Sequence, residues 1–234
     1  MDYIINDLKK LWGRLAANER WYEHQWLGVP IWQLPEDLIR LQEICFEVRP
    51  DWIVETGTKF GGSAIFFASL LELLGNRHGG IVTVDITSTD IAQETFASHP
   101  LRRYIKNVIV GDAASSEVGE QVRNALVNVP GKVLVFLDDN HNADHVYREM
   151  ELYAPFVSVE SYLIVADTIF QELAGTPVGM PTEKYPDVAA SNPRVAVERF
   201  LTGRRDFERD HRFIDKGMGN FPDGFLKKLC DEGS

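Results

Sequence analysis

The fold of this chain is decided by Asp51-Trp-Ile-Val-Glu-Thr-Gly-Thr-Lys-Phe-Gly-Gly-Ser63. The stretch begins with a short apolar run of strand-forming residues and then passes an acidic residue into a glycine-rich turn. From Ile65 to Leu74 apolar residues recur at helical spacing, and Gly75 is placed to cap the end of that helix. A strand, a glycine turn and a helix in this order are typical of a nucleotide pocket in an α/β sheet, because the turn lets a ligand approach the backbone at a helix N-terminus.

The spacing of the glycines narrows the kind of nucleotide. A dinucleotide fingerprint counted from Gly57 needs its middle glycine at position 59, which is Lys59. A phosphate loop needs a lysine before its serine or threonine, but Ser63 follows Gly62 directly. Neither of these two loops fits, and a buried glycine turn in some other α/β protein stays open as an alternative.

A second strand, Ile81-Val-Thr-Val-Asp85, follows the turn and also ends in an acid. Together, Glu55-Thr-Gly57 and Asp85 resemble the first two cofactor motifs of the S-adenosylmethionine (SAM)-dependent methyltransferases. The resemblance implies that the turn holds the methionine end of SAM. It also implies that Asp85 accepts hydrogen bonds from the ribose hydroxyls.

Length and composition indicate one globular domain over residues 1–234, since 44% of the residues are hydrophobic and 11% are aromatic. The formal net charge of −11 argues against a nucleic-acid partner, because neutralising phosphates needs a basic surface. Charges interrupt the longest apolar stretches, so no membrane span is expected, and the N-terminus does not read as a secretion signal. Only Cys45 and Cys230 occur, which favours a reduced, cytoplasmic protein.

The rest of the chain alternates strand and helix patterns. Further strands are predicted at 108–112, 132–139, 161–167, 207–214 and 224–229, and the run at 132–139 is the most apolar and therefore central. Helices are predicted from Pro35 to Val48 and over 115–128, 142–153 and 192–201. Residues 87–100 show no clear period, and 170–193 are interpreted as an irregular loop on the substrate side.

The N-terminal residues 1–35 are predicted to form a helical and aromatic cap. Residues 1–24 carry a helical apolar stripe, and Trp21, Trp26 and Trp32 follow within a short stretch. The tryptophans form either a satellite core under a long loop or an aromatic lid over the cofactor or a subunit contact. The sequence leaves these alternatives open.

Acidic residues end the predicted strands at the edge where an open α/β sheet binds its ligands. They are Glu55, Asp85, Asp138 and Asp167, with Asp112 as a fifth candidate. Any one of them could be a helix cap, worth roughly 1 kcal/mol, and Asp112 fits a cap as well as an adenine contact. Several carboxylates along one edge repel one another unless a cation or hydrogen-bond donors lie between them, so the set favours a ligand site.

Leu137-Asp-Asp-Asn-His141 and Val165-Ala-Asp-Thr168 resemble the two metal-binding strand ends of the catechol-type O-methyltransferases. The resemblance implies Mg²⁺ ligands at Asp138 and Asp167, with Thr168 where an asparagine would stand. All-oxygen ligation suits Mg²⁺. The resemblance also places His141 at the position of the general base, which suits an imidazole near neutral pH. The alternative is that His141 is a histidine of a surface loop.

A resemblance that covers roughly residues 25 to 229 is to the cephalosporin hydroxylase / rhamnosyl O-methyltransferase family. The motifs that carry it are Trp26-Leu-Gly-Val-Pro30, Pro35-Glu-Asp-Leu38, Arg49-Pro-Asp-Trp-Ile-Val-Glu-Thr-Gly57, Leu152-Tyr-Ala-Pro-Phe-Val-Ser158, Asn192-Pro-Arg-Val-Ala-Val-Glu-Arg-Phe-Leu201 and Asn220-Phe-Pro-Asp-Gly-Phe-Leu-Lys227. It implies a Rossmann-like class I methyltransferase fold, with a seven-stranded, mostly parallel sheet and helices on both faces. It also implies an enzyme, often oligomeric, that methylates hydroxyls of sugars or natural products. Some relatives place Glu-Asp where this chain has Ala166-Asp167, which removes one candidate metal ligand.

We therefore expect a SAM-dependent, Mg²⁺-assisted O-methyltransferase in which His141 deprotonates a hydroxyl that attacks the sulfonium methyl in line. On the methyltransferase resemblance, the residues expected to bind the cofactor are Glu55, Gly57, Thr58, Lys59, Ser63, Asp85, Ile86, Gly111, Asp112, Ala113 and Asp138. One alternative is a hydroxylase, although the sequence shows no facial triad for a redox metal. Another is an inactive SAM-binding subunit, for which Ala166 is the best argument.

Overall fold

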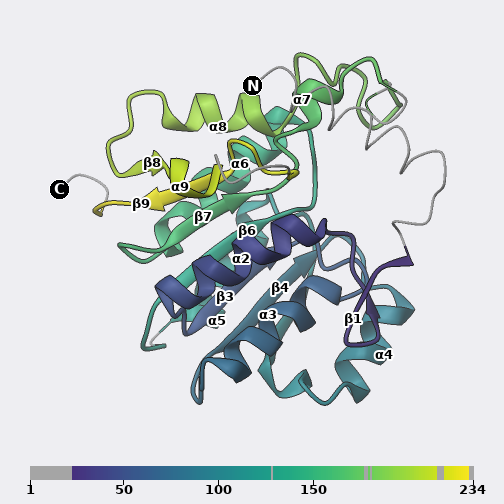
Figure 1. Cartoon of the computed structure of the whole chain (residues 1–234), viewed down its shortest axis with the longest axis vertical. Helices are drawn as coiled ribbons and strands as arrows, with labels where there is room; N and C mark the ends of the chain where they lie inside the picture. The colour runs from purple at the N-terminus through teal and green to yellow at the C-terminus, as the bar shows by residue number, and fades with distance from the viewer. Residues whose placement is uncertain (1–22, 128, 177–178, 180, 215–218, 232–234) are drawn as a thin grey trace.

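The computed structural model describes residues 23–231 except 128, 177–178, 180 and 215–218. Its described part is built on a twisted sheet of seven strands (Figure 1). In sheet order the strands are β5 (Ile105–Val110), β4 (Gly80–Asp85), β3 (Trp52–Thr56), β6 (Val133–Leu137), β7 (Tyr162–Val165), β9 (Phe225–Lys228) and β8 (Phe207–Arg209). The first five run parallel, and β9 lies antiparallel between β7 and β8.

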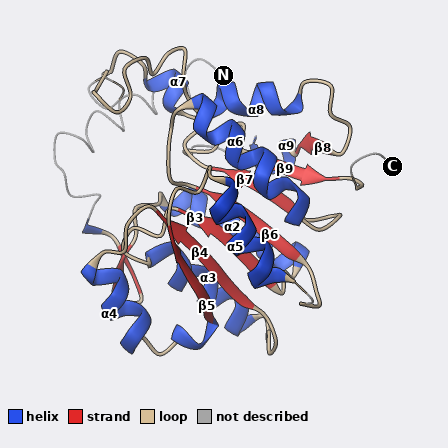
Figure 2. Ribbon diagram, turned by 180° about the vertical axis from the view of Figure 1, so that it is seen from behind, coloured by secondary structure: helices blue, strands red, loops and turns tan. Residues whose placement is uncertain are grey.

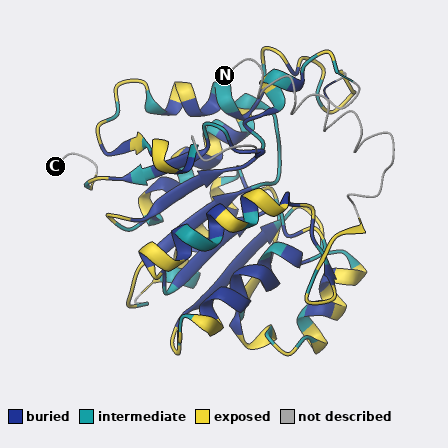
Figure 3. Cartoon of the chain, viewed as in Figure 1, coloured by how far each residue is buried: buried dark blue, intermediate teal, exposed yellow. Residues whose placement is uncertain are grey.

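Helices cover both faces of the sheet, as the opposite views in Figures 1 and 2 show. Apolar side chains of α2 (Pro35–Val48), α3 (Gly62–Leu73) and α9 (His211–Ile214) pack on one face. Those of α5 (Ser116–Leu126), α6 (Ala143–Tyr153) and α8 (Pro193–Leu201) pack on the other. Every residue of β3 and β6 is buried, and Figure 3 shows these central strands in dark blue. This architecture confirms the predicted mostly parallel, seven-stranded sheet with helices on both faces.

The remaining elements are short and lie around this frame. The hairpin of β1 (Gln25–Trp26) and β2 (Val29–Pro30) packs on α3, while α4 (Asp90–Ser98) follows β4 and α7 (Phe170–Leu173) follows β7. Single 3₁₀ turns span Arg102–Tyr104 and Ala154–Phe156. The helical stripe predicted for residues 1–24 falls almost wholly outside the described residues. Within the described part of the chain, no helix is both long and apolar enough to cross a membrane.

Two predictions about local structure are wrong. The strand expected over 207–214 ends at Arg209, because Asp210 starts α9: its side chain accepts the N–H of Arg212 and its carbonyl accepts that of Phe213. Residues 87–100, which showed no period, contain α4. The hydroxyl of Thr89 caps α4 by accepting the N–H of Ala92 at 3.1 Å.

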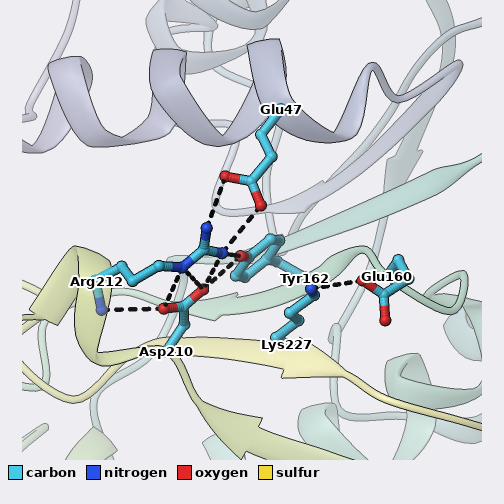
Figure 4. A network of polar contacts seen from close by, with 6 residues as sticks. All are labelled: Glu47, Glu160, Tyr162, Asp210, Arg212 and Lys227. Atoms are coloured by element: carbon cyan, nitrogen blue, oxygen red, sulfur yellow. Dashed lines mark hydrogen bonds and ion pairs between the residues drawn. The ribbon is translucent and has the colours of Figure 1, made fainter.

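A polar network ties the C-terminal strands to α2 and β7 (Figure 4). The guanidinium of Arg212 contacts the carboxylate of Asp210 at 2.6 Å and that of Glu47 at 2.9 Å. The hydroxyl of Tyr162 on β7 donates to Asp210 at 2.6 Å. The network therefore fixes the pair of strands β8 and β9 against the rest of the sheet. The chain enters β9 from the side of the cavity, so a fixed β9 also supports the cavity wall.

Candidate functional site

A cavity of about 810 Å³ opens at the carboxyl ends of the parallel strands. Its wall is made by the turns after β3, β4, β5, β6 and β7, together with residues 30–33, 184–185 and Asn220. An open α/β sheet binds its ligands at this edge, because helix N-termini and strand-end side chains converge there. The predicted site residues that line it are Gly57, Thr58, Lys59, Ser63, Asp85, Ile86, Asp112, Asp138, His141 and Asp167.

The glycine turn after β3 is shaped by close backbone contact. Gly57 has φ +89°, and a Cβ added there would lie 2.1 Å from the carbonyl oxygen of Asp138. Gly62 begins α3, and a Cβ there would lie 2.1 Å from the carbonyl oxygen of Pro30. The turn therefore requires glycine at both positions, and it brings the N-terminus of α3 to the cavity wall.

Asp85 at the end of β4 holds this turn in place. One of its carboxylate oxygens accepts the backbone N–H of Lys59 at 2.8 Å, and the other accepts that of Thr87 at 3.1 Å. Each carboxylate oxygen has a second lone pair that remains available to a ligand. Asp85 thus lines the cavity with a hydrogen-bond acceptor held in a fixed position.

Four of the predicted site residues do not line the cavity: Glu55, Gly111, Ala113 and Thr168. Glu55 is fully buried, its Oε1 accepts the hydroxyl of Thr83 at 2.7 Å, and burial raises its pKa to about 7. The hydroxyl of Thr168 accepts the N–H of Asp223 at 3.1 Å. The side chains of Glu55 and Thr168 thus support the strand ends from behind the cavity wall.

The tryptophans that the structure describes play different parts. Trp26 packs edge-on against Phe66 at 5.0 Å and donates its indole N–H to Ser69, so it belongs to the core of α3. Trp32 lines the cavity, where it meets Phe60 edge-on at 5.2 Å and the ammonium of Lys59 at 4.9 Å. The cluster is therefore partly core and partly an aromatic wall, while Trp21 lies outside the described residues.

Asp138 and Asp167, two partly exposed acids, line the part of the cavity that we call its acid end. Burial raises the pKa of both carboxyls, to about 7 for Asp167, and for Asp138 the charge of Asp167 adds to the effect. The side-chain amide of Gln33 donates to Asp138 Oδ2 at 2.5 Å. Bringing two carboxyls together is costly unless a cation or further donors balance them.

His141 stands beside these acids. Its Nε2 lies 3.4 Å from Asp167 Oδ2, and its ring stacks on Phe170 at 4.6 Å. Burial and the nearby charge of Lys184 lower the pKa of His141 to about 4. The imidazole is therefore neutral at pH 7, and it is a weaker base than a free histidine.

Sequence reasoning missed the polar residues that reach the acids from distant segments. Gln33 Oε1 and Asn220 Oδ1 are buried and have no hydrogen-bond partner among the described residues, and both residues line the cavity. Asp37 beneath them is fully buried, pairs with Arg40 and accepts the N–H of Asn220 at 2.7 Å. The motif Pro35-Glu-Asp-Leu38 did contain Asp37, but only as a first-turn acid of a helix.

Fold and site together define a class I O-methyltransferase architecture. CmcI with Mg and SAM superposes at a TM-score of 0.63 with 16% identity, covering 89% of this chain and 78% of that chain. The Bacillus cereus O-methyltransferase in complex with SAH superposes at 0.57 with 18% identity, covering 90% and 83%. At these identities the likeness shows the fold.

The chain belongs to the rhamnosyl O-methyltransferase/CmcI family, whose model matches residues 18–229. Rhamnosyl O-methyltransferase from Mycobacterium bovis (strain BCG / Pasteur 1173P2) is 29% identical over 214 residues, covering 90% of this chain and 80% of the relative. The one from Mycobacterium leprae (strain TN) is 32% identical over 162 residues, covering 69% and 66%. The match confirms the family predicted from the sequence and the class of enzyme, a SAM-dependent O-methyltransferase.

Proposed function

We propose that this enzyme transfers the methyl group of SAM to a hydroxyl of a sugar, with a rhamnosyl group as the first acceptor to test. The observation that carries the proposal is one cavity that joins the glycine turn and Asp85 to the acids Asp138 and Asp167. The turn supplies a place for a nucleoside, and the acids supply a place for a hydroxyl with its counter-ion. The curated relatives are named rhamnosyl O-methyltransferases, which supports a sugar acceptor.

The residues at the acid end of the cavity fit Mg²⁺. Asp138 and Asp167 supply carboxylates, and the orphaned oxygens of Gln33 and Asn220 supply neutral donors in place of the carboxylate lost at Ala166. An all-oxygen set of this kind is what Mg²⁺ prefers. When bound, the ion lowers the pKa of an acceptor hydroxyl. Thr168, whose hydroxyl is taken up by Asp223, is less suited as a ligand.

The residues of the chain then orient the reactants. Asp85 and the turn at Gly57 fix the cofactor, while Trp32 supplies an apolar wall of the cavity. His141, neutral and 3.4 Å from Asp167, accepts the proton of the hydroxyl as it attacks the sulfonium methyl. Holding the oxygen and the methyl group in line is the main contribution to the rate.

The test is turnover with methyl-labelled SAM and rhamnosyl glycosides as acceptors. We expect label in the glycoside, and loss of turnover on chelation that Mg²⁺ restores. The matched variants are Asp167→Asn, which removes a proposed ligand, and Glu208→Gln, which changes an exposed acid on β8. Full activity after chelation would remove the metal from the proposal. Label in no sugar acceptor, with SAM still bound, would favour an inactive subunit.

The role of His141 has its own test. A general base contributes roughly 10² to 10⁴ in rate, so His141→Ala should lower kcat by that order with little change in SAM affinity. His141→Gln keeps a polar side chain of similar reach but cannot accept the proton. A glutamine enzyme that keeps most of its rate would leave His141 as a residue that only shapes the loop.

A further inference from the structure

We propose a second metal site in this protein, formed by Asp139, His145 and Glu149 and suited to a first-row transition metal, with Zn²⁺ the best match. It is distinct from the pair Asp138 and Asp167. Within the described residues, these three side chains each offer a ligand atom, and the three atoms all lie within 4.8 Å of one another.

The positions of the three residues follow from two elements. Asp139 is the second residue after β6, while His145 and Glu149 lie four residues apart on α6 and therefore share one face of it. His145 Nε2 is 3.2 Å from Asp139 Oδ2 and 3.7 Å from Glu149 Oε2. Ligands about 2.1 Å from a tetrahedral Zn²⁺ lie roughly 3.4 Å apart, so these separations are already close to those of a bound ion.

The second observation is a group of buried polar atoms without partners. Glu149 is 1% exposed, and neither of its carboxylate oxygens has a hydrogen-bond partner among the described residues. Asp139 Oδ1 and the hydroxyl of Tyr153 are also buried without a hydrogen-bond partner among the described residues. Leaving buried polar atoms unpaired is costly, and more so when they are charged. A cation between the carboxylates would remove much of this cost.

The charges around the group are consistent with a cation. Two carboxyl groups, those of Asp139 and Glu149, share this site with one imidazole, that of His145. The other occupant to consider is therefore a proton shared between Asp139 and Glu149. Among the described residues, Thr56 influences Glu149, and the imidazoles of His145 and His141 influence Asp139.

The donor set selects the kind of metal. One imidazole nitrogen with carboxylate oxygens suits Zn²⁺ and its neighbours, whereas Mg²⁺ and Ca²⁺ prefer oxygen alone. Asp112 Oδ1 lies 3.8 Å from His145 Nε2 and lines the cavity, so the fourth position faces Asp112 or water. Three protein ligands would hold the ion firmly and leave that position open to the cavity.

The site would have a positioning role. Asp138 and Asp139 are consecutive, and they turn to different partners: Asp138 to Gln33, Asp139 to α6. A metal bound to Asp139, His145 and Glu149 would pin α6 to the end of β6. The loop between them carries His141, so the ion would fix that loop.

The experiment is calorimetric titration of the metal-free full chain with Zn²⁺ in a large excess of Mg²⁺, which occupies an oxygen-only site. We expect one Zn²⁺ per chain. Glu149→Gln and the more exposed His145→Gln should each lower the Zn²⁺ affinity more than about 100-fold, since even outer partners of a ligand are worth roughly 10- to 100-fold. Asp167→Asn, the matched control at the other acids, should leave it within a few-fold. Co²⁺ in place of Zn²⁺ should give the visible spectrum of a low-coordinate ion.

Two results would overturn the proposal. One is no Zn²⁺ binding by the folded wild type, which would assign Asp139 and Glu149 to a shared proton. The other is Zn²⁺ binding that Asp167→Asn abolishes and His145→Gln preserves, which would place the ion at the first pair of acids. Circular dichroism of each variant shows that it is folded, and His145→Gln tests the site even if Glu149→Gln does not fold. Since the titration contains neither SAM nor an acceptor, its outcome is independent of the proposed methylation.

Discussion

Gly57 is the residue on which the cofactor pocket depends most directly, because two separate constraints meet there. Its φ of +89° disfavours a side chain, and its Cα faces the carbonyl oxygen of Asp138. Gly75 has a similar φ of +75°, but a Cβ there would meet nothing within 4 Å. Comparing an alanine variant at each of the two positions therefore distinguishes the effect of backbone strain from that of steric contact.

Gly57→Ala should abolish SAM binding and lower stability by more than the roughly 1–2 kcal/mol that a left-handed alanine costs. Gly75→Ala should show that cost alone and keep its affinity for SAM. Calorimetric SAM titration and denaturant unfolding of both variants make the comparison. Equal behaviour of the two would mean that the contact with Asp138 is relieved by a small shift of the turn.

Gln33 should determine metal affinity at the first pair of acids. Gln33→Leu removes an amide oxygen that has no other partner, so Mn²⁺ affinity should fall about 10-fold. Gln33→Glu adds a carboxylate where Ala166 left none, and it should raise the affinity. Mn²⁺ binding followed by electron paramagnetic resonance, with SAM absent, measures both. A leucine variant that binds Mn²⁺ like the wild type would limit Gln33 to holding Asp138 through its N–H.

Among single residues, the sequence predicted the acids at the strand ends as site residues. Asp85, Asp138 and Asp167 line the cavity because the carboxyl ends of parallel strands meet at one edge. It did not predict Gln33 or Asn220, since their approach depends on where α2 and β9 pack, and no local pattern records that. Glu55 was assigned to the cavity wall, yet the alternation of β3 turns its side chain under the wall, onto Thr83.

Among the elements, the long periodic ones followed from the sequence, and the short ones did not. The helices α2, α3, α5, α6 and α8 match predicted segments because each buries an apolar stripe. Only Ala92 and Thr95 are buried in α4, so that helix has no stripe to detect. The end of β8 was not predicted, because apolar and polar residues alternate from Phe207 to Ile214 as they do in a strand. The strand ends where it does because Asp210 caps the following helix.

The network around Arg212 should make stability depend on pH. Burial acts to raise the pKa of Asp210, but hydrogen bonds from Arg212 and Tyr162 outweigh it and lower the pKa below its ordinary value. The carboxyl of Asp210 thus binds a proton less readily in the folded state than in the unfolded state. The stabilisation that the Asp210 carboxylate gives to the folded state is therefore present above the unfolded pKa of about 3.9. It is lost as pH falls through the folded pKa.

Asp210→Asn should accordingly lower the Tm at pH 7, and the difference from wild type should shrink below about pH 4. Glu208→Gln, an exposed neighbour on β8, is the control and should change Tm little at either pH. Thermal unfolding across the pH range makes the measurement. A constant difference between wild type and Asp210→Asn would assign the loss to packing and not to the charge.

For the whole molecule, SAM should act as a stabilising ligand. A cofactor at 100 times its Kd adds about 2.7 kcal/mol to the stability of the folded chain. Asp85→Ala should weaken SAM binding by roughly 1.5–3 kcal/mol, the worth of hydrogen bonds to a charged group, and so lose most of that gain. Measuring the Tm of the wild type and of Asp85→Ala, each with and without SAM, tests this prediction. An undiminished SAM-induced shift in a folded Asp85→Ala protein would place the ribose elsewhere.

The cavity is closed by segments from opposite ends of the described chain. Asp37 on α2 accepts the backbone N–H of Asn220, 183 residues further on, and Asn220 leads into β9, which lies between β7 and β8. During synthesis, all the other strands leave the ribosome before β9. A nascent chain can therefore assemble most of its sheet while the pocket still lacks a wall. A translation product that stops short of Asn220 lacks the residue that Asp37 holds at the cavity wall, so we expect it to be inactive.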